Sequence, residues 1–212
     1  MWAFRNDSSS VKLIFFTGRP SNAVLLARVL RERDLNADLV LADLEGKPES
    51  ASLMTLMLLR WTAEFCPSAP FLVKITDEGR VSGRFLEGAY NLNVELSSQF
   101  DLFGSFVSLR GEPCSEPPPY HSTRRCPDQG GFLSGCAYML ARRVVRPLLR
   151  ASVAQPPVLP EDVYVTGILA ETIGARRAEM TNFEGCYFSF VKAMPFKPQN
   201  MHYWFRDRFL II

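Results

Sequence analysis

The chain has 212 residues, of which 47% are hydrophobic and 22% are charged, which suits one globular domain with a full-sized core. Its formal net charge is +2, with acids and bases mixed along the sequence, so the charge pattern gives no case for nucleic-acid binding. No apolar stretch is long enough to cross a bilayer, and residues 1–10 lack the apolar core of a signal peptide.

The first half of the chain alternates between expected strands and expected helices. Apolar runs rich in branched and aromatic residues predict strands, and apolar residues three and four apart predict helices. Strands are expected at residues 11–17, 38–42 and 71–75, and helices at residues 22–33 and 51–65. Ser21 is the expected N-cap of the first helix. This order favours an α/β domain with a parallel sheet built from βαβ units.

The second half is less regular. A cluster of prolines predicts a loop over residues 111–129. The remaining expected elements are a helix at 85–96, a strand at 102–109, an apolar stretch at 130–140, and helices at 144–151 and 161–171. No internal repeat or domain boundary is visible, so residues 1–212 are interpreted as a single domain.

The cysteine pattern leaves two readings open. There are five cysteines and no C-x-x-C pair, which argues against a zinc knuckle or a thioredoxin-like motif. Cys114 and Cys126 flank the proline-rich loop, where a disulfide would hold an irregular segment together. Five reduced, mostly buried thiols fit the spacing equally well.

Candidate ligand-binding residues follow the expected strands. In open α/β sheets, ligands bind at the carboxyl ends of the strands. The first strand ends near Arg19, which suits a phosphate, and the second ends at Asp43. The third is followed by Thr76, Asp77 and Glu78, and carboxylates are the ligands that Mg²⁺ and Mn²⁺ favour. A charged turn after a buried strand explains the same pattern.

A second acidic pair, Glu161 and Asp162, opens the last expected helix. Acids in the first turn of a helix are stabilising without any catalysis, whereas a general base must reach the proton of its substrate. His202 lies in an aromatic stretch near the C-terminus. A histidine there is more often a packed or surface residue than a metal ligand.

The order of these features resembles glycosyltransferase family 31, the β-1,3-galactosyl- and β-1,3-N-acetylglucosaminyltransferases. The resemblance covers most of the chain, and its two most specific parts are a W…C…K pattern and an E-D-V-Y-V segment. The matching segments are FFTG at 15–18, DLVLADL at 38–44, Trp61 with Cys66, Phe71 and Lys74, the acidic motif at 76–78, the Gly-rich stretch at 130–140, and PEDVYVTG at 160–167.

This resemblance implies the nucleotide-diphospho-sugar transferase fold, a Rossmann-like, mostly parallel sheet flanked by helices. It also implies an inverting transfer of galactose or N-acetylglucosamine from a UDP-sugar to a glycoprotein or glycolipid acceptor in β-1,3 linkage, with Mn²⁺ as cofactor. By the same resemblance, Asp162 matches the catalytic base and Glu78 matches a metal ligand. His202 matches a C-terminal metal ligand, Asp77 the middle acid of the motif, and Asp43 a residue near the nucleotide.

The sequence departs from the family pattern at several positions. Thr76 replaces the first acid of the motif and supplies no charge, and Glu78 is one methylene longer than Asp. Met54 stands where the family commonly has a Lys that can face the nucleotide. These departures raise the alternative that the protein is a catalytically impaired, glycan-binding or chaperone-like member of the family.

The resemblance also bears on the start of the chain. Trp2 matches the Trp that ends an R-x-T-W helix inside the catalytic domain of the family. We therefore expect an N-terminally truncated catalytic domain. In full-length relatives a cytoplasmic tail, a signal-anchor and a stem precede this domain and place it on the lumenal side of the Golgi membrane.

Overall fold

The fold is seen in a computed structural model, which describes residues 11–45, 50–76, 99–108 and 130–180 with their side chains, and residues 124–125 and 206–211 as backbone. The strands are β1 (Lys12–Arg19), β2 (Leu39–Glu45), β3 (Phe71–Ile75), β4 (Leu102–Ser108), β5 (Arg124–Arg125), β6 (Gly131–Ala141), β7 (Arg177–Glu179) and β8 (Arg206–Ile211). The helices are α1 (Ala23–Asn36), α2 (Ala51–Phe65), α4 (Arg142–Ala154), the π-helix η2 (Val163–Leu169) and α5 (Ala170–Thr172).

Most of the expected elements are confirmed. Helix α2 and strand β3 begin and end at the predicted residues. The N-cap of α1 was predicted one residue too early: Asn22, rather than Ser21, accepts a hydrogen bond from the Leu25 N–H through its side-chain oxygen, at 3.2 Å. The last expected helix is wound as η2 over most of its length. The helix expected at 85–96 lies outside the described residues.

The strands form one mixed sheet in the order β2-β1-β8-β3-β6-β4-β7-β5. The α/β class with helices packed on a sheet is confirmed, and β1, α1 and β2 form the expected βαβ unit. The expectation of a mostly parallel sheet was wrong. Strand β8 lies between β1 and β3 and is antiparallel to both, and β6 lies between β3 and β4 and is antiparallel to both. Both strands come late in the chain, so the βαβ pattern of the first half does not reveal them. Strands β1, β2 and β3 nevertheless run in one direction.

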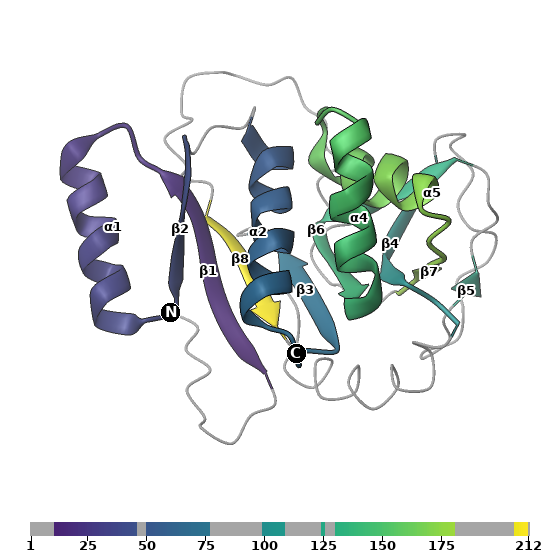
Figure 1. Cartoon of the computed structure of the whole chain (residues 1–212), viewed down its shortest axis with the longest axis horizontal. Helices are drawn as coiled ribbons and strands as arrows, with labels where there is room; N and C mark the ends of the chain where they lie inside the picture. Colours follow the sequence, from purple (N-terminus) through teal and green to yellow (C-terminus); the bar gives the residue numbers. More distant parts are fainter. Residues whose placement is uncertain are drawn as a thin grey trace, which may run out of the picture.

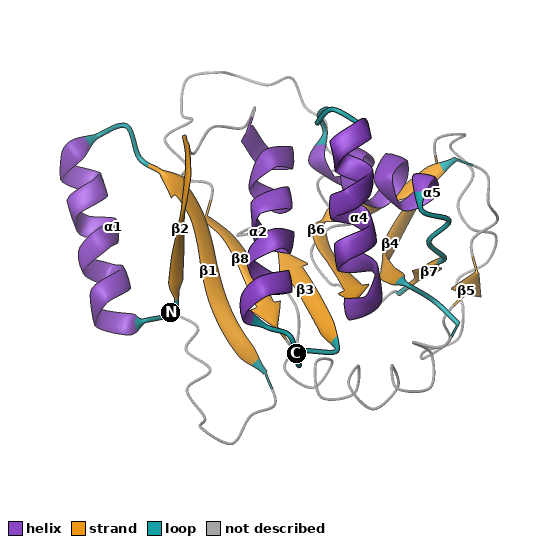
Figure 2. Cartoon of the chain, viewed as in Figure 1, coloured by secondary structure: helices purple, strands orange, loops and turns teal. Residues whose placement is uncertain are grey.

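Helices α2, α4 and η2 pack on one face of this sheet. Figure 1 shows α2 and α4 side by side in front of the strands, and Figure 2 shows the same layering by element type. Alternation along β3 sends Leu72 and Lys74 toward the helices, and Phe71, Val73 and Ile75 into a second apolar cluster of the sheet. Lys74 is thus a charged residue in the middle of a fully buried strand.

Candidate functional site

The candidate site lies at the carboxyl ends of the parallel-running strands. Strand β3 ends at Ile75, which pairs with Ala137 of β6, and β6 continues past this point with Cys136 and Gly135. The chain segment at Glu161–Asp162 approaches the same stretch of β6 from the start of η2. Two segments far apart in sequence therefore meet at one edge of the sheet.

Asp162 is half-buried and is held by two backbone N–H groups. The N–H of Gly135 donates to Oδ2 and the N–H of Val163 donates to Oδ1, each at 2.9 Å. A carboxylate oxygen can accept more than one hydrogen bond, so each oxygen retains capacity for another donor. The side chain is fixed in orientation but remains chemically able to take a proton.

Gly135 can donate to Asp162 because β6 leaves its regular pairing there. The register with β4 shifts between Gly104, opposite Tyr138, and Phe106, opposite Leu133, so the residues between these pairs bulge out of the ladder. A Cβ at position 135 would lie 3.1 Å from both Cβ and Oδ2 of Asp162. Glycine at this position therefore permits the close approach of the acid.

Thr166 fixes the start of η2 against the same strand. Its hydroxyl oxygen accepts from the Leu133 N–H at 2.7 Å and donates to the Asp162 carbonyl at 2.7 Å. The hydroxyl is buried, so these bonds stabilise the position of Asp162 relative to β6.

Thr76 joins the end of β3 to the residue next to Gly135. Its N–H donates to the Cys136 carbonyl at 2.9 Å. Thr76 and Asp162 thus bind successive residues of β6. Asp77, Glu78 and His202 lie outside the described residues.

Glu161 belongs to a buried network beneath Asp162. Its Oε2 forms an ion pair with Nζ of Lys74 at 2.9 Å, and its Oε1 accepts from the hydroxyl of Tyr138 at 2.7 Å. Sequence reasoning missed Gly135 and Tyr138, and treated Lys74 only as part of a motif. The one signal available was a Lys in the middle of an apolar strand, because a buried Lys requires a partner.

Burial is the main influence on the acidity of Asp162. Desolvation raises the pKa of its carboxyl above the ordinary value of 3.8, and the neighbouring Glu161 charge raises it further. The hydrogen bonds from Gly135 and Val163 and the charge of Lys74 lower this pKa, but they do not cancel the rise. A raised pKa makes Asp162 a stronger base than an ordinary aspartate.

We expect Asp162→Asn to gain stability relative to the wild type as pH rises. Because the folded-state pKa of Asp162 is raised, this group stabilises the fold fully below its unfolded pKa, and that contribution is lost as pH rises through the folded pKa. Urea unfolding of both proteins, from below pH 3.8 to neutral pH, measures the difference. The raised pKa would be contradicted if the difference in free energy of unfolding between variant and wild type stayed constant, or if the variant lost stability relative to the wild type as pH rose.

Arg19 and Asp43 lie together, but not beside Asp162. Their closest nitrogen and oxygen are 3.8 Å apart, and the side chains are 60% and 92% exposed, so the pair adds little stability. They border a depression of about 180 Å³ that is otherwise apolar, lined by Leu26, Leu30, Leu41 and Ala42. Strands β8 and β3 separate this place from Asp162 in the sheet order. Met54 is 6% exposed and packs in the helix-side core.

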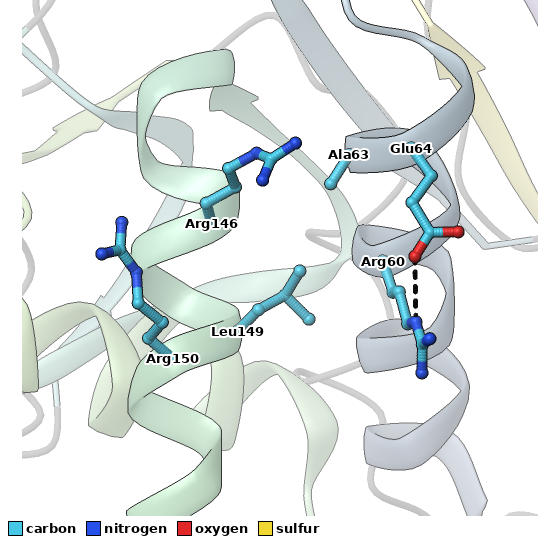
Figure 3. A pocket seen from close by; sticks show the side chains of 6 residues that line it. All are labelled: Arg60, Ala63, Glu64, Arg146, Leu149 and Arg150. Carbon is cyan, nitrogen blue, oxygen red and sulfur yellow. Dashed lines mark hydrogen bonds and ion pairs between the residues drawn. The ribbon is translucent and has the colours of Figure 1, made fainter.

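A larger groove of about 470 Å³ lies between α2 and α4, away from this site. Figure 3 shows Arg146 and Leu149 of α4 pointing toward the end of α2, where Arg60 and Glu64 form an ion pair at 3.1 Å. Arg150 also lines this groove. That end of α2 leads to the start of β3, whereas Asp162 is bound to β6 beside the end of β3. The groove therefore is not part of the carboxylate site.

Two features are absent from the described parts of the chain. No group of three or more His, Cys, Asp or Glu side chains there is arranged to hold a metal ion. In the same residues, no helix combines the length and apolar character needed to span a bilayer. Of the cysteines, Cys66 and Cys136 are described, and neither forms a disulfide within the described residues. Cys114 and Cys126, for which the sequence leaves a disulfide and reduced thiols open, lie outside the described residues.

An α/β sheet covered by helices, with Asp162 held against β6 beside the end of β3, fits the nucleotide-diphospho-sugar transferase fold. Residues 2–181 match the family described as Galactosyltransferase, and the chain belongs to this family. The resemblance seen in the sequence is thereby confirmed.

Individual relatives are similar at low identity. The chain is 26% identical to Beta-1,3-galactosyltransferase 5 of Homo sapiens over 92% of its own length. It is 28% identical to UDP-GlcNAc:betaGal beta-1,3-N-acetylglucosaminyltransferase 8 of Homo sapiens over 80%, and 24% identical to Beta-1,3-galactosyltransferase 1 of Mus musculus over 86%. The chain spans 66%, 44% and 57% of the length of these three relatives, respectively.

Proposed function

We propose that this chain is an inverting hexosyltransferase that moves galactose or N-acetylglucosamine from a UDP-sugar to a glycan acceptor in β-1,3 linkage, with Asp162 as the general base. Membership of the galactosyltransferase family supports the reaction class. The observation that carries the residue assignment is the Asp162 carboxylate, fixed by the N–H groups of Gly135 and Val163 at the carboxyl edge of the sheet.

The proposed reaction is a single displacement. Asp162 accepts the proton of an acceptor hydroxyl as that oxygen forms a bond to the anomeric carbon of the donor sugar. The bond between this carbon and the UDP oxygen breaks on the opposite face, so the configuration inverts. The raised pKa of Asp162 improves the driving force for this proton transfer at neutral pH.

The donor side of the site is assigned from the sequence. We propose that Arg19, Asp43 and Asp77 contact the nucleotide, and that Glu78 and His202 hold Mn²⁺. Carboxylate and imidazole donors suit this ion, and Thr76, which precedes the acidic residues, is bonded to the strand that holds Asp162. When bound, the ion would neutralise charge on the departing diphosphate.

The second candidate is a family member that binds glycans or assists folding without catalysis. The observation that favours it is Thr76, which has no charge and whose hydroxyl donates to the Cys136 carbonyl at 3.4 Å. In either case we propose a glycoprotein or glycolipid partner and the lumenal side of the Golgi membrane as the setting, as the resemblance implies.

Calorimetric titration with UDP, with and without Mn²⁺, separates the two candidates. We expect binding that requires Mn²⁺, because metal ions bridge carboxylates to diphosphate oxygens. Arg146→Ala serves as a control, since this exposed arginine lines the distant groove and is expected to leave UDP binding unchanged. Absence of binding at millimolar UDP in the presence of Mn²⁺ would favour the non-catalytic candidate.

A further inference from the structure

The Lys74–Glu161 ion pair is an unusual feature of the core beside Asp162. The two side chains are 4% and 8% exposed, and their charged atoms are 2.9 Å apart. Moving two charges out of water costs more than their attraction commonly returns, so a buried pair of this kind is weak support for stability. Leu72, the other residue of β3 that faces the helices, is aliphatic. An apolar residue would therefore suit position 74 if packing alone mattered.

The pair is connected to Asp162 in two ways. Glu161 precedes Asp162 directly in the chain, and its second oxygen is bound by Tyr138 at 2.7 Å. Lys74 also donates to the carbonyl of Gly135 at 3.4 Å, and Gly135 provides the N–H that binds Asp162. The Lys74 ammonium lies 5.3 Å from the centre of the Tyr138 ring. One lysine thus links the residue before the acid to the residue that holds its carboxylate.

We propose that Lys74, Glu161 and Tyr138 are positioning residues for Asp162: they fix its carboxylate against Gly135, and Lys74 offsets the charge that Glu161 places beside it. This inference rests on the proposed role of Asp162 as the general base. It explains why the first acid of the two, Glu161, is buried and paired with a lysine, whereas the second, Asp162, is half-buried and held by two backbone N–H groups.

The charges around Asp162 determine in which direction each substitution should shift its pKa. Within the described residues, the charged groups that act on its pKa are Glu161, which raises it, and Lys74 on β3, which lowers it. Strand β6 contributes the Gly135 N–H and the Tyr138 phenol. From α2, the uncharged Ser52 hydroxyl donates to the Val158 carbonyl before η2, at 2.5 Å. Arg142 of α4 donates to the carbonyls of Thr62 and Ala63 and not to Asp162. Arg177 of β7 donates to the carbonyls of Gly131 and Thr166.

Removing the charge of one member of the pair should therefore shift the pKa of Asp162, and removing both charges should return this pKa toward its wild-type value. Glu161→Gln keeps the shape of the side chain and removes the negative charge that raises the pKa of Asp162, while Lys74 keeps the positive charge that lowers it, so this pKa is expected to fall. The double variant Glu161→Gln/Lys74→Met has no net change in charge, and its Asp162 pKa is expected to return close to that of the wild type.

The experiment is a carbon-13 NMR titration of the Asp162 carboxyl in the substrate-free protein, assigned by comparison with Asp162→Asn. An unchanged Asp162 pKa in Glu161→Gln, or a double variant that stays at the value of the single, would overturn the charge-offsetting role. Because this titration needs no turnover, it can succeed even if no sugar transfer is found, and the two proposals fail separately.

Tyr138→Phe tests the positioning role without changing any charge. It removes the hydrogen bond to Glu161 while keeping the aromatic ring, and we expect kcat to fall by about ten-fold with the KM for the donor unchanged. A purely structural role predicts a lower Tm with kcat unaltered, and that outcome would overturn the proposal. It also provides an independent test should Glu161→Gln fail to fold.

Discussion

Asp162→Asn is expected to lower sugar transfer by about 10²- to 10⁴-fold, the range that a positioned general base contributes. The amide retains an oxygen that can accept from Gly135 or Val163, but it cannot take the proton of the acceptor hydroxyl. Affinity for UDP should stay close to that of the wild type, because the role proposed for Asp162 concerns the acceptor hydroxyl and not the nucleotide. The measurements are product formation from a UDP-sugar and calorimetric binding of UDP to the same preparation.

The control for this substitution is Asp34→Asn. Asp34 is an exposed residue of α1 that pairs with Arg33, so it reproduces the chemical change away from the site. Its transfer rate is expected to match that of the wild type. Transfer retained by Asp162→Asn would remove Asp162 from the role of base, even if UDP still binds.

Gly135→Ala is expected to lower kcat by about ten-fold or more while the protein stays folded. The new Cβ would lie 3.1 Å from Oδ2 of Asp162, closer than nearly all such contacts, so the carboxylate must shift by a few tenths of an ångström. The backbone N–H remains available to donate. The expected loss therefore comes from misplacement of the base, to which proton transfer is sensitive.

Gly167→Ala is the matched control for this glycine. It lies in η2, and a Cβ there would meet Phe132 at 3.4 Å, an ordinary contact that does not touch Asp162. Steady-state kinetics and thermal unfolding of both variants separate misplacement from instability. A kcat for Gly135→Ala equal to that of Gly167→Ala would show that close contact between β6 and Asp162 is not required.

The local elements of this protein could be predicted from sequence because their signals are short-range. Helix α2 and strand β3 were predicted with their observed limits, since apolar periodicity and the flanking residues mark both ends. The mixed pairing of the sheet could not be predicted. Strand β8 lies at the end of the chain, and its insertion between β1 and β3 depends on backbone pairing across the whole domain.

The candidate site, too, could be predicted only in part from the sequence. Asp162 could be proposed from its motif and its place at a helix start, whereas its partner Gly135 is 27 residues away and donates only because β6 bulges. Lys74, which forms the ion pair with Glu161, is 87 residues away, on β3. No pattern of neighbouring residues encodes such contacts, because they arise when separate elements pack.

The sequence by itself determined the α/β class, the order of the first elements and the family to which the chain belongs. Those properties follow from local periodicity and from motifs that are contiguous in the chain. Only the tertiary structure decided that β3, β6 and η2 meet at one edge of the sheet, with Lys74 paired to Glu161 beneath Asp162. Burying these charged groups required partners from different strands, and chain folding alone brings such partners within hydrogen-bonding distance.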